Sequence, residues 1–126
     1  MNQPHPLSFL PLREPTFYIL ISLLPSEKHG YAILKEVEGL SEGRVRLSTG
    51  TLYEALARLL DQGLIEHIGG DVSGMEATNP GKPRKHYRLT RTGRRVIEAE
   101  AARLQTQVAA ALRQMGGSWT ETVSSD

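Results

Sequence analysis

The sequence contains no cysteine, few aromatic residues and no long hydrophobic run. The lack of cysteine excludes disulfides, thiolate metal ligands and cysteine nucleophiles. The longest apolar run, residues 17–24, has only eight residues, whereas about 20 are needed to cross a bilayer. Residues 1–12 lack the basic start of a secretory signal. We therefore expect a cytoplasmic protein without a membrane partner.

A length of 126 residues, with 39% hydrophobic and 23% charged residues, is typical of one soluble domain. By size scaling, a fold of this length buries roughly two-thirds of the surface of its unfolded chain. The chain can therefore form a real core without disulfides or metals.

The formal net charge is only +1, but the positive charge is concentrated. Residues 82–95 hold seven of the 15 Lys and Arg residues and none of the 14 Asp and Glu residues. This segment carries +7 and the rest of the chain −6, because eight basic residues there are set against 14 acidic ones. Such a segment is typical of a surface that binds phosphates, since each neutralised phosphate releases a counterion. A solvated basic face without a partner explains the same run.

Three helices are predicted in the first half of the chain. Residues 14–24 predict a helix that is apolar on every side, with Pro15 in its first turn and Pro25 directly after it, although a buried strand fits the run almost as well. Residues 30–38 predict a second, short helix that Gly39 is expected to end. The third helix is the clearest, since apolar residues recur at i, i+3, i+4, i+7 and i+8 from Leu52, after Ser48 as the N-cap.

A hairpin and a long helix are predicted in the second half. Residues 64–68 and 85–89 alternate in the way that is typical of strands. Between them, residues 69–84 are rich in glycine and proline and too long for a tight turn, so we expect a mobile arm. After Thr90 as the N-cap, a last helix is predicted as far as Met115.

The last helix carries an apolar seam. Its members are spaced alternately by four and three positions, as in a heptad repeat. They are Ile97, Ala101, Leu104, Val108, Ala111 and Met115. Packing on the core of the same domain explains this seam too, but three short helices form a small core for a helix of about 25 residues. We therefore expect the seam to join two copies of the chain.

This order of elements is that of a winged helix-turn-helix. We expect a mainly α fold of the α+β type, with a three-helix core, a two-stranded wing and a long C-terminal dimerisation helix. The predicted parts are an N-terminal arm (1–12), a DNA-binding domain (13–89), the dimerisation helix (90–115) and a disordered tail (116–126).

The third helix of such a fold lies in the major groove, with its first residues at the base edges. Thr49, Thr51 and Tyr53 offer hydroxyl groups there, and Gly50 allows the backbone to come close to DNA. Two simpler explanations stay open. Capping alone explains the threonines, since residues 51–54 match a capping box, and partial burial explains Tyr53.

Three segments resemble the PadR-type transcriptional regulators. They are HGYAILKE (29–36), STGTLYEALARLLDQGLIE (48–66) and YRLTRTGRR (87–95). The resemblance spans residues 7–115 and implies a dimeric repressor with a winged-helix DNA-binding domain. The single long final helix resembles the short subgroup of that family.

The resemblance, together with the position of two arginines just before the third helix, gives two sets of candidate DNA-binding residues. On the recognition helix the set is Ser48, Thr49, Gly50, Thr51 and Tyr53. At the DNA backbone and on the wing the set is His29, Tyr31, Arg44, Arg46, Lys82, Arg84 and Lys85. Two departures from the family pattern affect base preference and wing contacts: Glu54 stands where proline is common, and the loop 69–83 is longer than usual.

The resemblance also implies that small aromatic or lipophilic effectors bind near the dimer interface and change the distance between the recognition helices. Phe17 and Tyr18, with Leu104 and Val108 of the last helix, are candidates to line such a site. Plain packing of the core or the interface explains the same four residues.

The leading hypothesis is a homodimeric repressor that binds an inverted repeat in double-stranded DNA, with half-sites about 34–36 Å apart. The alternative is a winged-helix module that binds proteins, which would have no need of the basic segment. No enzyme, metal or cofactor is expected. The four histidines are scattered without the spacing of metal ligands, and no nucleophile motif or glycine-rich phosphate loop is present.

Overall fold

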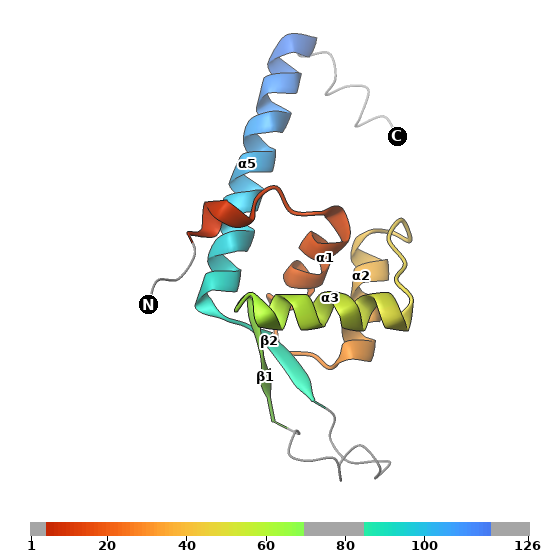
Figure 1. Cartoon of the computed structure of the whole chain (residues 1–126). Coiled ribbons are helices and arrows are strands. Elements are labelled where there is room, and N and C mark those ends of the chain that lie inside the picture. The colour runs from red at the N-terminus through yellow and green to blue at the C-terminus, as the bar shows by residue number, and fades with distance from the viewer. Residues whose placement is uncertain (1–4, 70–84, 117–126) are drawn as a thin grey trace.

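The computed structural model describes residues 5–69 and 85–116 (Figure 1). Its elements in order are η1 (Pro6–Phe9), α1 (Glu14–Ser22), α2 (Gly30–Leu40), α3 (Thr49–Asp61), β1 (Ile65–Ile68), β2 (His86–Leu89) and α5 (Arg91–Met115). The predicted winged helix-turn-helix with a long final helix is confirmed. The predicted mobile arm and disordered tail lie outside the described residues, apart from Gly69 and Gly116.

Helix α1 packs against both α2 and α5. Its second residue is Pro15, which suits the first turn because a proline nitrogen has no hydrogen to donate. The helix ends at Ser22, two residues before the predicted end, where the N–H groups of Leu23 and Leu24 bond to carbonyls only three residues back. A buried strand over this run is excluded.

Helix α2 is longer than predicted. It begins after His29, whose Nδ1 accepts a hydrogen bond from the Ala32 N–H at 3.3 Å, and it continues through Gly39 to Leu40. The chain turns at Glu42 and Gly43 instead, which have φ values of 54° and 82°. Gly39 was therefore the wrong terminator, because the left-handed residues that end the turn lie three and four positions later.

The wing is an antiparallel pair in which Ile65 faces Leu89 and His67 faces Tyr87. Residues that face each other in such a pair project on the same side of the sheet. A backbone bridge between Lys28 and Tyr87, with N···O distances of 3.1 Å and 2.8 Å, joins the start of α2 to the wing.

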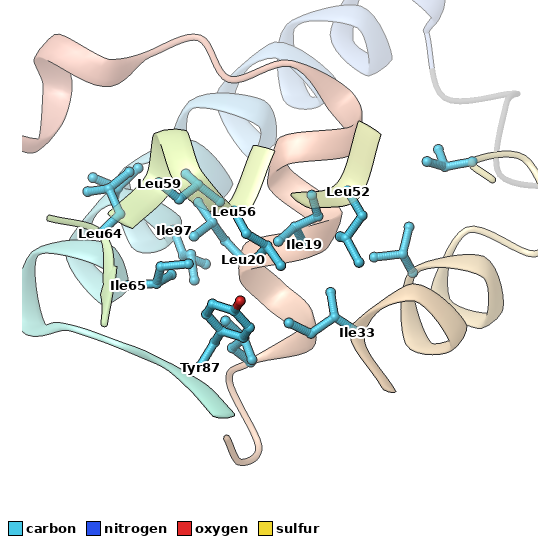
Figure 2. Close-up of a cluster of buried hydrophobic side chains, with 14 residues drawn as sticks. Ile19, Leu20, Ile33, Leu52, Leu56, Leu59, Leu64, Ile65, Tyr87 and Ile97 are labelled. Atoms are coloured by element: carbon cyan, nitrogen blue, oxygen red, sulfur yellow. The ribbon is translucent and has the colours of Figure 1, made fainter. Parts of the chain in front are cut away.

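The core is formed by side chains from α1, α2, α3, the two strands and the first turns of α5 (Figure 2). Its buried members include Ile19, Leu20, Ile33, Leu52, Leu56, Leu59, Leu64, Ile65, Tyr87, Val96 and Ile97. On α5 the buried residues are Gly93, Val96, Ile97 and Glu100, all in the first three turns. The rest of this 25-residue helix extends out of the domain (Figure 1).

Candidate nucleic-acid interface

The first turn of α3 is exposed and capped by its own side chains. Ser48 Oγ accepts the Thr51 N–H at 3.1 Å and donates to Thr51 Oγ1 at 3.0 Å. The N-cap is thus Ser48, as predicted. A capping box over residues 51–54 would need Thr51 as the N-cap, so this box does not form. Thr49, whose side chain has no hydrogen-bond partner among the described residues, lies exposed beside them.

Gly50 is also exposed, and a Cβ built on it would meet nothing within 4 Å. The described fold therefore does not require a glycine here. Glu54, one turn further along, is exposed as well.

Tyr53 links α3 to the start of α2. Its side chain is 46% exposed, yet a Cβ on Gly30 would lie only 2.2 Å from the Tyr53 hydroxyl oxygen. The ring therefore rests on Gly30. Tyr53 is thus partly buried by this contact while the rest of it stays exposed. The pKa of the neighbouring Tyr87 is raised, first by burial and then by the nearby Tyr53. The contact of Tyr53 with Gly30 could not be predicted from the sequence, because the two residues lie 23 positions apart.

The start of α2 carries further polar side chains. The rings of His29 and His86 meet edge to face, with centroids 5.9 Å apart. Tyr31 is 57% exposed, and the Lys35 ammonium lies 5.8 Å from the centre of its ring. Because backbone N–H groups at a helix N-terminus favour anions, this end of α2 suits a phosphate.

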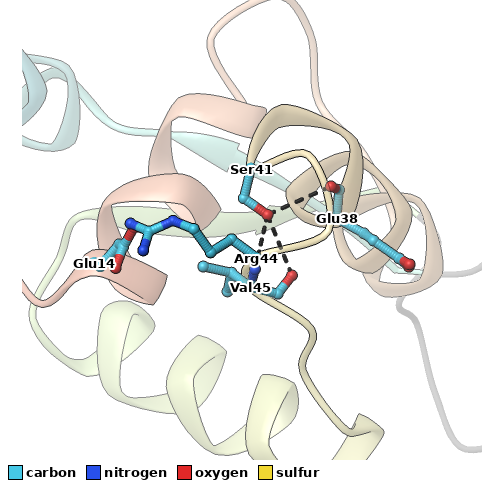
Figure 3. Close-up of polar contacts among 5 residues, drawn as sticks. All are labelled: Glu14, Glu38, Ser41, Arg44 and Val45. Atoms are coloured by element: carbon cyan, nitrogen blue, oxygen red, sulfur yellow. Dashed lines mark hydrogen bonds and ion pairs between the residues drawn. The ribbon is translucent and has the colours of Figure 1, made fainter.

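The two arginines that precede α3 already have acidic partners, and Figure 3 shows that of Arg44. Arg44 pairs with Glu14 of α1, and Arg46 Nε lies 3.4 Å from a carboxylate oxygen of Glu38 in α2. Ser41 holds the intervening turn, since its hydroxyl accepts the Val45 N–H at 2.9 Å. Such exposed pairs contribute about 0–1 kcal/mol, so either arginine can exchange its carboxylate for a phosphate.

Of the predicted wing residues, only Lys85 belongs to the described part, and it is exposed. Lys82 and Arg84 lie outside it. Arg88, the next basic residue of the segment, forms an ion pair with Glu66 across the two strands, with 2.7 Å between Nε and Oε2. The charge available for DNA on the described part of the wing is thus smaller than the residue count suggests.

The apolar seam of α5 is divided between two environments. Ile97 is buried in the core of its own domain, and Leu104 is half-buried. Val108 and Met115 are 54% and 57% exposed, with Ala101 and Ala111 exposed beside them. Outside the core, the seam therefore presents apolar side chains that the described chain does not cover.

The candidate effector residues come from two elements. Phe17 and Tyr18 of α1 are half-buried against the core, whereas Leu104 and Val108 lie on α5 beyond it. An open hollow of about 420 Å³ exists elsewhere, at the start of α5, lined by Gly63, Thr90, Arg91, Thr92 and Arg95. None of the four candidates lines it.

Within residues 5–69 and 85–116, no three His, Asp or Glu side chains gather in a way that could hold a metal ion. Over the same residues, no helix has the length and apolar character needed to cross a membrane.

Comparison with known proteins points to one family. The sequence profile of the transcriptional regulator PadR-like family matches residues 19–99. Among solved structures, a PadR family transcription regulator from Clostridium difficile is 24% identical, with a TM-score of 0.63 over 83% of this chain and 100% of that one. A transcriptional regulator from Clostridium thermocellum is 22% identical, with a TM-score of 0.62 over 79% of this chain and 87% of that one.

A third solved structure, a PadR family transcriptional regulator from Eggerthella lenta, is 26% identical, with a TM-score of 0.57 over 82% of this chain and 86% of that one. The first two structures share the fold, and the third adds similarity in sequence. No sequence among the curated proteins matches the chain.

Proposed function

We propose, from the premise that the chain belongs to the PadR-like family of transcriptional regulators, that it acts as a homodimeric repressor on an inverted-repeat operator. The observation that carries this proposal is the exposed start of α3. Thr49, Gly50 and Thr51 are exposed, and within residues 5–69 and 85–116 neither the core nor any other element packs over them. A helix start that presents hydroxyls and a bare backbone fits the base edges of the major groove.

Two other elements flank this helix start. Tyr53 rests on Gly30, so the N-terminus of α2 lies beside α3, and the Lys28–Tyr87 bridge ties the wing to the same place. The start of α2 would then hold a phosphate through its N–H groups and Tyr31, while Lys85 and the wing meet the backbone nearby. Arg44 and Arg46 would join by exchanging their acidic partners for phosphates.

The test is binding to duplex DNA at several salt concentrations. If the dimer contacts six to ten phosphates, a plot of log K against log salt falls with a slope of roughly −5 to −9. Affinity that does not depend on salt, or no binding in dilute buffer, would favour the protein-binding module instead.

Base and backbone contacts can be separated by substitution. Arg84→Ala should weaken binding to specific and random duplexes alike, whereas Tyr53→Ala should change the preference among sequences. Arg113→Ala, in the last turn of α5, removes the same charge away from α3 and is the control. Equal losses on both kinds of DNA for both variants would contradict this division.

The dimer would form through the exposed part of the α5 seam. Leu104→Glu with Val108→Glu should give monomers by light scattering, since two carboxylates would enter an apolar contact. Ala102→Glu with Thr106→Glu adds the same charges, at the same spacing, on the opposite side of the helix, where both residues are exposed. A dimer that survives the first pair would place the interface elsewhere.

Relief of repression by a small aromatic or lipophilic effector is the last part of the proposal. Such a compound must prefer one arrangement of the two subunits, since equal affinity for both shifts nothing. Phe17 and Tyr18, with the Leu104–Val108 face of a partner, would supply the apolar surface. A thermal-shift screen with phenolic and cationic compounds tests it.

A further inference from the structure

A buried carboxylate lies where α5 leaves the domain. Glu100 is only 2% exposed, and it is the last of the buried residues of α5. Burial of a charge is costly unless hydrogen bonds and an opposite charge compensate it. None of the proposed DNA contacts uses this group, so its burial needs another explanation.

Two partners compensate the charge. Arg103 donates from Nε to Oε1 at 2.6 Å and from Nη2 to Oε2 at 3.0 Å, which is a bidentate pair. The Leu12 backbone N–H donates to Oε2 at 3.0 Å. The hydrogen bonds from Arg103, and then that from Leu12, lower the pKa of Glu100 against the effect of burial. The group is therefore a carboxylate near neutral pH.

Leu12 belongs to an N-terminal segment that crosses α5. Helix η1 lies against α5, and the chain then runs over to the start of α1 (Figure 1). Phe9, Leu10 and Leu12 pack against the core. Residues 5–12 thus cover α5 on one side while the core holds it on another, and the Glu100–Leu12 bond fastens this segment to the helix.

The hydrogen bond between Glu100 and Leu12 lies at the point where α5 leaves the domain, so a change in this bond would change the direction of the helix. The helix runs on for 15 residues from Glu100 to Met115, which is about 22 Å at 1.5 Å per residue. A tilt of about 10° at Glu100 would move the far end by about 4 Å, close to the rise of one base pair, ~3.4 Å.

We propose that Glu100 is a positioning residue for DNA recognition, because by fastening residues 5–12 to α5 it fixes the direction of the helix that joins the two subunits. The direction of α5 in turn sets the distance between the two recognition helices, and hence the half-site spacing that the dimer accepts. This inference rests on the proposed binding of DNA by a homodimer.

The test compares Glu100→Gln with Glu98→Gln. Glu98 is exposed on the same helix, so its replacement removes the same charge without touching Leu12. The probe is a duplex that the wild-type protein selects from random sequences, remade with its half-sites one or two base pairs closer or further apart. Affinities are measured by fluorescence anisotropy.

We expect the wild-type protein and Glu98→Gln to lose at least about tenfold in affinity for each base pair of changed spacing. Glu100→Gln should bind the original spacing about three- to tenfold more weakly and lose less than about threefold per base pair, because a loosened helix accepts several spacings. A smaller folded fraction alone would lower affinity equally at every spacing, so the shape of the profile separates positioning from stability.

Arg103→Lys provides a milder variant that keeps the positive charge but cannot form the bidentate pair. Its spacing profile should lie between those of the wild-type protein and Glu100→Gln, and it decides the matter if Glu100→Gln does not fold. Profiles parallel to the wild-type one overturn the positioning role while leaving the proposed function intact. Absence of DNA binding by the wild-type protein overturns both.

Discussion

Replacing Gly93 by alanine tests how closely α5 must approach the wing. Gly93 is buried in the first turn of α5. A Cβ at this position would lie 2.0 Å from the carbonyl oxygen of Leu64 and 3.3 Å from Cδ2 of Leu89. Because the nearer atom is backbone, no change of rotamer relieves the overlap. The start of α5 would have to move away from Leu64 by about 1.5 Å to reach an ordinary contact distance of about 3.5 Å.

That movement has a cost that can be worked out from the contacts. Overpacking of this kind costs about 1–3 kcal/mol. The hydrogen bond from the Thr90 N–H to the same Leu64 oxygen, 3.1 Å long, would weaken, at a cost of about 1 kcal/mol. Alanine gains about 1 kcal/mol over glycine in a helix. Because the last two contributions roughly cancel, the expected net loss is about 1–3 kcal/mol in the free energy of unfolding, a large part of the ~5–15 kcal/mol typical of a domain.

Urea unfolding followed by circular dichroism measures this loss, with Gly39→Ala as the control. Gly39 is also helical, but it is exposed and a Cβ there would meet nothing within 4 Å. The control should gain about 0.5–1 kcal/mol, since only helix propensity changes. The same substitution, glycine to alanine, should thus lower the free energy of unfolding at Gly93 and raise it at Gly39. A Gly93→Ala protein within about 0.5 kcal/mol of wild type would refute the close approach.

Three further predictions follow from single contacts. Ser48→Ala should cost about 1 kcal/mol in urea unfolding through loss of the α3 cap, and an unchanged midpoint would contradict the capping role. Gly30→Ala should displace the Tyr53 ring, whose exposed end can move. The free energy of unfolding should therefore change by less than about 1 kcal/mol, while selection from random DNA should yield altered binding sites. Unaltered binding sites would contradict a role of Tyr53 in recognition. The pKa of Glu100 is held below its ordinary 4.5 by Arg103, so its stabilisation is full above that pH and is lost as pH falls further. The difference in unfolding free energy between wild type and Glu100→Gln should therefore shrink below pH 4.5, and a constant difference would show that the charge is not responsible.

The sequence predicted those features that depend on neighbouring residues. Ser48 and Thr90 were predicted as N-caps and do cap α3 and α5, because a cap involves a side chain and an N–H three residues later. The apolar spacing of α3 likewise identified its buried face, where Leu52, Leu56 and Leu59 lie. Local patterns thus sufficed for the fold and for the exposed helix start.

Features that join distant parts of the chain could not be predicted in this way. Glu100 looked like any charged residue of an exposed helix, and only the fold brings Leu12 to it, 88 positions away. The pairing of Arg44 with Glu14 and the contact of Tyr53 with Gly30 are equally non-local. The Gly39 error has a different, local origin: the turn at Glu42 and Gly43 is held by Ser41, whose hydroxyl accepts the Val45 N–H, and the presence of a glycine does not by itself identify which residue takes the left-handed conformation.

The described basic residues of the segment 82–95 come from more than one element. Lys85 lies just before β2, whereas Arg91, Arg94 and Arg95 lie in the first turns of α5, after the strand has ended. Positive side chains at a helix N-terminus oppose the helix dipole, and no acidic residue in the first turn offsets them. Their field would still attract a polyanion from a distance of about 8 Å, the screening length at physiological salt. The segment would therefore support the proposed DNA binding by steering as well as by contact, whereas the proposed sequence recognition relies on the exposed start of α3.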